Sequence, residues 1–107
     1  MKLFIDSANL NDIIDCWNTG LIDGVTTNPS LIAKSGDTAE AVYDRLAEIG
    51  VPDISMEVMG NQCQMGNQAF ELFSKYKEVA TIKLPMTRDG LLVCRELTPL
   101  GIRTNVT

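Results

Sequence analysis

Short strand-like runs alternate with longer helix-like runs along the whole chain. The strand-like runs are apolar or alternate with period two, whereas the helix-like runs repeat apolar residues at intervals of three and four. Five strands are predicted, at residues 3–7, 24–28, 54–58, 80–84 and 102–107. Repeated strand–helix units of this kind predict parallel strands joined by right-handed helical crossovers, and therefore an α/β fold.

The helix-like runs start after residues that commonly cap helices. Asn9 and Thr87 each precede such a run, and either Asp37 or Thr38 precedes another. A short helical turn is expected after Pro29, where the second strand ends. The chain shows no linker, charge block or low-complexity segment. It is therefore expected to form a single partial domain, residues 1–107, that is truncated in its fifth strand.

Each predicted strand has polar residues on one face near its carboxyl end, and the opposite face is largely apolar. An open doubly wound sheet is covered by helices on both faces and needs apolar residues on both. A closed (β/α)₈ barrel instead turns one face inward and gathers its active site at the carboxyl ends of the strands. The pattern therefore predicts the N-terminal half of such a barrel, about four and a half βα units of a fold that needs roughly 200 residues. The polar residues are Asp6, Asn28, Glu57, Lys83, Asn105 and Thr107.

The composition limits which partners and cofactors the chain is expected to bind. Nine Lys and Arg against fourteen Asp and Glu give a net charge of −5, which argues against a nucleic-acid partner. No apolar run reaches the ~20 residues of a membrane helix, so no membrane partner is expected. The chain has no His and no glycine-rich phosphate loop, and it gives no sign of a cofactor or metal. Its three cysteines, at 16, 63 and 94, fit no disulfide or zinc spacing and are expected to be buried in helices.

Five segments in this order resemble the N-terminal half of the small transaldolases, the subfamily that also contains fructose-6-phosphate aldolase. The resemblance covers the whole chain, and the second and last segments are highly specific. The segments are Phe4-Ile5-Asp6, Gly24-Val25-Thr26-Thr27-Asn28-Pro29-Ser30, Glu57-Val58, Ile82-Lys83-Leu84-Pro85 with Thr87, and Gly101-Ile102-Arg103-Thr104-Asn105-Val106-Thr107.

The resemblance implies a (β/α)₈ barrel enzyme that moves a dihydroxyacetone unit from a ketose phosphate to an aldose phosphate. It implies that Lys83 forms a Schiff base and that Asp6 handles protons during carbon–carbon cleavage. Glu57 and Thr107 are implied to activate a water, and Asn28, Asn105 and Thr26 to bind substrate. It further implies sugar phosphate substrates, no cofactor, the pentose phosphate pathway, a cytoplasmic location and, at full length, a homo-oligomer.

Each of these residues also has an ordinary structural interpretation. A lysine at a sheet edge commonly extends to water, whereas a buried lysine is more easily the neutral amine that attacks a carbonyl. Asp6 is also typical of a loop, and Glu57 of a solvated strand end. Asn28 before a proline is typical of a turn, and Thr107 and Thr26 are typical of strands.

Two alternatives to a transaldolase remain open. One is a fructose-6-phosphate aldolase-like lyase, which carries Gln where this chain has Glu57. The other is a non-catalytic half-barrel fragment. The family's later strands, with the Ser and Arg that bind substrate phosphate, are not among these residues, so the 107 residues alone are expected to be an incomplete enzyme.

Overall fold

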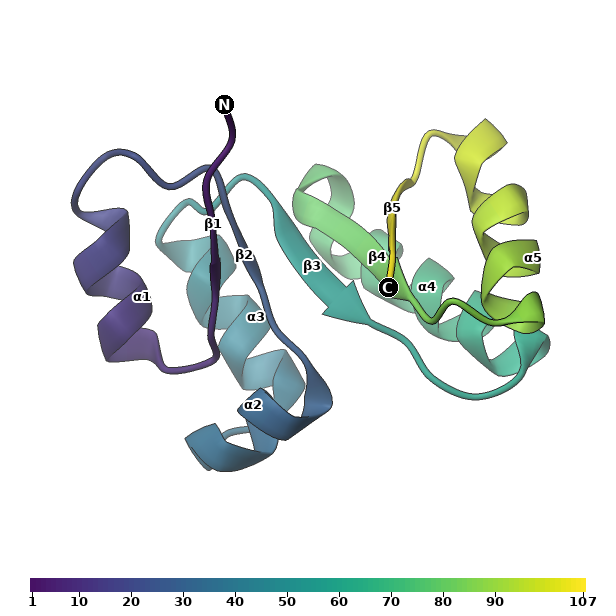
Figure 1. Cartoon of the computed structure of the whole chain (residues 1–107), viewed down its shortest axis with the longest axis horizontal. Coiled ribbons are helices and arrows are strands. Elements are labelled where there is room, and N and C mark those ends of the chain that lie inside the picture. The colour runs from purple at the N-terminus through teal and green to yellow at the C-terminus, as the bar shows by residue number, and fades with distance from the viewer. The chain divides into compact units, whose positions relative to one another are not determined.

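The computed structural model describes all 107 residues as alternating strands and helices (Figure 1). The strands are β1 (Phe4–Asp6), β2 (Gly24–Thr26), β3 (Ile54–Glu57), β4 (Ala80–Leu84) and β5 (Arg103–Val106). The α-helices are α1 (Leu10–Trp17), α2 (Pro29–Ser35), α3 (Ala39–Glu48), α4 (Gln62–Tyr76) and α5 (Arg88–Leu97). Short 3₁₀ turns, η1 (Lys77–Val79) and η2 (Thr98–Leu100), follow α4 and α5.

The strands follow one another in chain order, β1-β2-β3-β4-β5. β1 is parallel to β2, with Asp6 opposite Thr26, and β4 is parallel to β5, with Lys83 opposite Asn105. A doubly wound sheet reverses its strand order at a switch point, whereas a βα barrel adds strands in sequence. The predicted α/β class and the N-terminal half of a barrel are confirmed.

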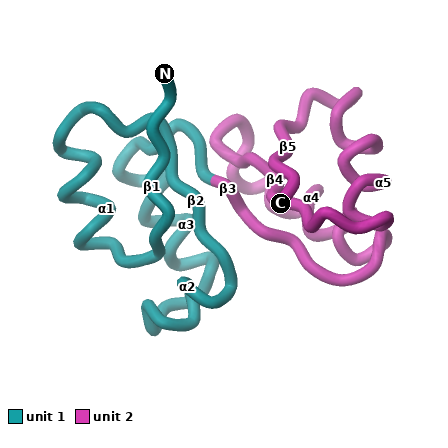
Figure 2. Tube along the Cα trace, viewed as in Figure 1, with its two compact units in different colours: residues 1–54 teal, residues 55–107 magenta.

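The chain contains two compact units, residues 1–54 and 55–107, which are coloured separately in Figure 2. Their boundary falls inside β3, after Ile54, where the sequence has no linker. The Val25 N–H donates to the carbonyl of Asp53 within the first unit, at 2.9 Å. Within the second, the Val58 N–H donates to the carbonyl of Lys83, at 3.1 Å. The single-domain expectation remains a prediction.

Each unit buries its own apolar side chains. The first unit buries Ala8, Ile13, Val25, Val42, Tyr43, Leu46, Val51 and Ile54. The second has a core of Val58, Met65, Ala69, Ile82, Leu84, Val93, Leu97 and Ile102. These cores form because one face of each helix repeats apolar residues with the helical period.

The helices begin where the sequence places capping residues. Asn9, Thr38 and Thr87 each accept a hydrogen bond from a backbone N–H in the first turn, so Thr38 rather than Asp37 caps α3. Pro29 is the first residue of α2, a position where its missing N–H costs little. None of the helices is long and apolar enough to cross a membrane.

The structure corrects the expectation that all three cysteines are buried. Cys63 is exposed, and Cys16 and Cys94 are half-buried. α4 buries Met65 and Ala69, and Cys63 lies two residues before Met65. Because each helical residue turns by about 100°, a side chain two positions away faces roughly the opposite side.

Candidate active site

The carboxyl ends of β3 and β4 bring a lysine and a carboxylate together in the second unit. Lys83 Nζ lies 3.7 Å from Glu57 Oε2. Their side chains are only 13% and 22% exposed, respectively, so water is largely excluded from this pair. Two residues to which the sequence analysis assigns functional roles therefore lie at the distance of an ion pair.

The alternation along β4 explains why Lys83 sits among apolar neighbours. Ile82 and Leu84 are fully buried in the core on one face of the strand, and Lys83 takes the other face. Thr81, on the same face as Lys83, is 7% exposed. The lysine therefore stands on a mostly buried strand, and the solvated sheet-edge interpretation does not fit it.

Asn105 and Ser55 form a second polar contact in the same unit. The Asn105 Nδ2 group donates to Ser55 Oγ at 3.4 Å, and Ser55 is 2% exposed. Asn105 lies opposite Lys83 in the β4–β5 register. Ser55 was not among the residues predicted for the site, although period-two alternation places it on the same face of β3 as Glu57.

The backbone of Thr107 holds the end of β5 beside the end of β4. Its N–H donates to the Leu84 carbonyl at 2.9 Å, and its carbonyl accepts from the Met86 N–H at 2.7 Å. Thr107 itself is exposed. These bonds fix the backbone from which its hydroxyl extends.

In the first unit, Asp6 and Thr26 form a hydrogen bond across the paired strands β1 and β2. The Thr26 Oγ1 hydroxyl donates to Asp6 Oδ1 at 2.9 Å. Asn28 does something different, because its Oδ1 accepts from the Leu31 N–H at 2.9 Å and so caps α2. The Asn28 oxygen therefore has a structural role, as the cap of α2.

Comparison with known proteins decides the family. The family model for transaldolase/fructose-6-phosphate aldolase matches residues 3–107. The chain belongs to this family. It is 49% identical to a probable transaldolase of Geobacter metallireducens and to one of Geobacter sulfurreducens, and 44% identical to one of Thermodesulfovibrio yellowstonii. Each match covers all of this chain and 50% of the relative, so the chain spans about half the length of these curated relatives.

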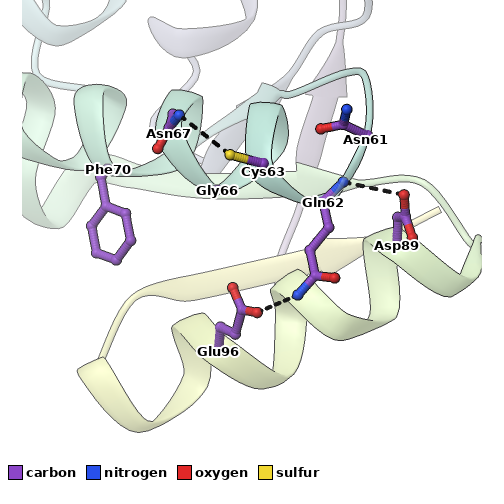
Figure 3. Close-up of a pocket in the computed structure, with 8 residues that line it drawn as sticks. All are labelled: Asn61, Gln62, Cys63, Gly66, Asn67, Phe70, Asp89 and Glu96. Carbon is purple, nitrogen blue, oxygen red and sulfur yellow. Dashed lines mark hydrogen bonds between the residues drawn. The ribbon is translucent and has the colours of Figure 1, made fainter.

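The second unit also contains a pocket of about 440 Å³ (Figure 3). It is bordered by α4 and α5, and Gln62 links them, because its N–H donates to Asp89 and its side-chain amide to Glu96. No motif or periodicity in the sequence indicates this pocket. None of the family's motif residues lines it.

The Arg103 side chain binds the protein backbone. Its guanidinium donates to the backbone carbonyl of Glu78, and it borders a second pocket, of about 430 Å³, with Phe73 and Gly101. Arg103 precedes Asn105 by two residues in β5 and lies opposite Thr81. No three Cys, Asp or Glu side chains lie close enough together to hold a metal ion.

Proposed function

We propose that this chain contributes the Schiff-base half of a transaldolase active site. The reaction transfers a dihydroxyacetone unit from a ketose phosphate, sedoheptulose 7-phosphate or fructose 6-phosphate, to an aldose phosphate. Membership of the family supports the reaction class. The observation that carries the proposal is the largely buried Lys83–Glu57 pair, with 3.7 Å between Nζ and Oε2.

The first step is attack of the neutral Lys83 amine on the ketone carbon, C2, of the ketose. The carbinolamine that forms then loses water and becomes an iminium ion. Glu57 is close enough to Lys83 to move protons to and from this centre, directly or through one water. We assign Thr107, which lies at the end of β5, to hold the water through which Glu57 transfers protons.

The second step breaks the bond between C3 and C4, since a three-carbon unit is transferred. Asp6 accepts the proton of the C4 hydroxyl, the aldose phosphate leaves, and the bonding electrons move to the iminium to give an enamine. The hydrogen bond from Thr26 orients the Asp6 carboxylate for this role. Attack of the enamine on an acceptor aldehyde reverses the sequence, and hydrolysis then restores Lys83.

Asn28, Asn105 and Thr26 are assigned to the substrate hydroxyls. The side chain of Asn105 already uses one N–H on Ser55, which fixes the orientation of its amide. The Asn28 oxygen is engaged with α2, so the helix cap also holds this residue in place. We further assign the reaction to the pentose phosphate pathway in the cytoplasm, with a homo-oligomer as the full-length form.

A second candidate is a lyase of the same family that releases free dihydroxyacetone. In that reaction the enamine is protonated and hydrolysed instead of attacking an aldehyde. Position 57 discriminates the two, because this chain has Glu where the aldolase branch has Gln. The carboxylate beside Lys83 favours transfer.

Borohydride trapping tests the proposal in the protein at the full length encoded by its gene. Reduction in the presence of fructose 6-phosphate should leave a dihydroxyacetone adduct on Lys83, located by mass mapping. The solvent-exposed Lys34, Lys75 and Lys77 serve as internal controls and should stay unmodified. An adduct on one of these, or none on Lys83, would refute the assignment.

A further inference from the structure

Two glutamines of α4 hold the backbone that follows Glu57. The Gln68 Nε2 group donates to the Met59 carbonyl at 2.8 Å, and Gln68 Oε1 accepts from the Met59 N–H at 3.0 Å. One helical turn earlier, Gln64 Oε1 accepts from the Asn61 N–H at 2.9 Å. The Gln64 N–H in turn donates to Asn61 Oδ1 at 2.9 Å. Two residues of α4 therefore form four hydrogen bonds with Met59 and Asn61, in the loop between β3 and α4.

The contact at Gln68 resembles the pairing of a neighbouring strand, because one side chain satisfies both backbone polar groups of Met59. Only a neutral amide can do this, since it offers a donor and an acceptor together, whereas a carboxylate only accepts. Met59 is 58% exposed, so apolar packing does little to fix the residue. The position of the Met59 backbone therefore depends on the Gln68 amide.

The loop is restrained on both sides of Met59. The Val58 N–H donates to the Lys83 carbonyl at 3.1 Å, immediately after Glu57. Gly60 has a φ of 112°, and a Cβ built on it would lie 2.4 Å from Gln64 Oε1. Glycine at this position lets the loop turn closely against Gln64.

We propose that Gln68 is a positioning residue for the Glu57 carboxylate, an inference that rests on the proposed function. Gln68 fixes the backbone two residues after Glu57 and so maintains the 3.7 Å separation between Glu57 Oε2 and Lys83 Nζ. A catalytic group must be held within about 0.5 Å of its productive geometry, and a 1 Å error can cost about 100-fold in rate. Gln68 acts through Glu57, which performs the proton transfer.

Loss of the Gln68 amide should slow Schiff-base formation. In Gln68→Ala, water can bind the exposed Met59 backbone groups, so the fold survives while the loop moves. The expected rate of Lys83 adduct formation is between about tenfold and 100-fold lower. Gln68→Glu keeps the side-chain length but sets a carboxylate against the Met59 carbonyl, and should slow the rate in the same way.

The experiment measures the initial rate of dihydroxyacetone trapping on Lys83 by borohydride, in the full-length protein. Asn67→Ala is the matched control, because Asn67 is the adjacent exposed residue of α4 and its amide contacts the Cys63 sulfur, at 3.9 Å, and not the Met59 backbone. Its rate should stay within about twofold of the wild-type rate. Wild-type rates in both Gln68 variants would overturn the inference.

A double-mutant cycle separates positioning from general stability. In a Glu57→Gln background, Gln68→Ala should cause no further loss of rate, because the carboxylate that it positions is gone. An additional tenfold loss there would show that Gln68 acts through the fold, and would overturn the inference. Backbone hydrogen exchange at Met59 should accelerate in Gln68→Ala, and unchanged exchange would contradict the proposed restraint.

The two proposals fail in distinguishable ways. A wild-type protein that forms no adduct on Lys83 refutes the proposed function, together with the role of Gln68 that rests on it. A wild-type protein that forms the adduct at a rate insensitive to Gln68 refutes only the positioning role.

Discussion

The two units use the polar residues at their strand ends differently. In the first unit, Asp6 is exposed and accepts from Thr26, and Asn28 caps a helix. In the second, Lys83 and Glu57 form a pair whose side chains are only 13% and 22% exposed. The second unit therefore offers the more desolvated environment.

This difference indicates how the proposed chemistry is divided. Charges interact more strongly where water is partly excluded, whereas exposed pairs are screened. Formation of the Schiff base needs a proton carrier positioned beside the amine, and in the second unit Glu57 Oε2 lies 3.7 Å from Lys83 Nζ. Proton removal from a substrate hydroxyl and the binding of hydroxyls tolerate the wetter surroundings of Asp6 and Thr26.

Removing the charge of Glu57 should have the largest effect. Glu57→Gln keeps the size of the side chain but removes its ability to accept a proton, and loss of such a group typically costs 10²–10⁴-fold in turnover. A coupled assay should show this loss and a changed ratio of free dihydroxyacetone release to transfer. Glu48→Gln is the control, since Glu48 lies in an exposed pair with Arg45. If neither rate nor ratio changes, position 57 does not divide the two activities.

Asp6→Asn should separate cleavage from Schiff-base formation. We expect turnover with fructose 6-phosphate to fall about 100-fold, because the group that accepts the hydroxyl proton is lost. Trapping with dihydroxyacetone itself requires no carbon–carbon cleavage and should remain near the wild-type level. Asp12→Asn, at an exposed position of α1, controls for loss of charge in the same unit. Equal loss of trapping and turnover would contradict the division between the units.

Features that depend on local residue pattern could be predicted from the sequence. The caps at Asn9 and Thr87 follow from residue type and spacing, whereas the choice of Thr38 over Asp37 came from the structure. β4 has the predicted bounds of residues 80–84. β1, β2, β3 and β5 are one or two residues shorter than predicted. The pairing of β-strands is non-local, so sequence pattern alone sets these ends poorly.

The contacts that restrain the site were harder to predict. The strand alternation placed Glu57 and Lys83 on polar faces, but their 3.7 Å separation depends on how β3 and β4 align. The double hydrogen bond between Gln68 and Met59 depends on the turn at Gly60 and on the length of one side chain. No periodicity in the sequence marks either feature.

A methyl group at Gly90 should destabilise the second unit. A Cβ there would lie 2.0 Å from the Pro85 carbonyl oxygen, a backbone atom that cannot move aside easily. Gly90→Ala should lower the free energy of unfolding by about 1–3 kcal/mol, measured by urea denaturation and circular dichroism. Trp17 lies in the first unit, so its fluorescence transition should shift less. An equal shift in both signals would show that the units unfold together.

The smallest effect should be a gain in stability from Gly66→Ala. Gly66 lies inside α4, beside the pocket of Figure 3, and a Cβ there would have no atom within 4 Å outside its own local helix. Alanine restricts the unfolded chain and favours the helix, by about 0.5–1 kcal/mol relative to glycine. The urea midpoint should therefore rise slightly, opposite in sign to the change at Gly90. Because the substitution adds no contact to the core, a loss of stability would mean that this part of α4 is packed against something in solution, and the open pocket would have to be abandoned.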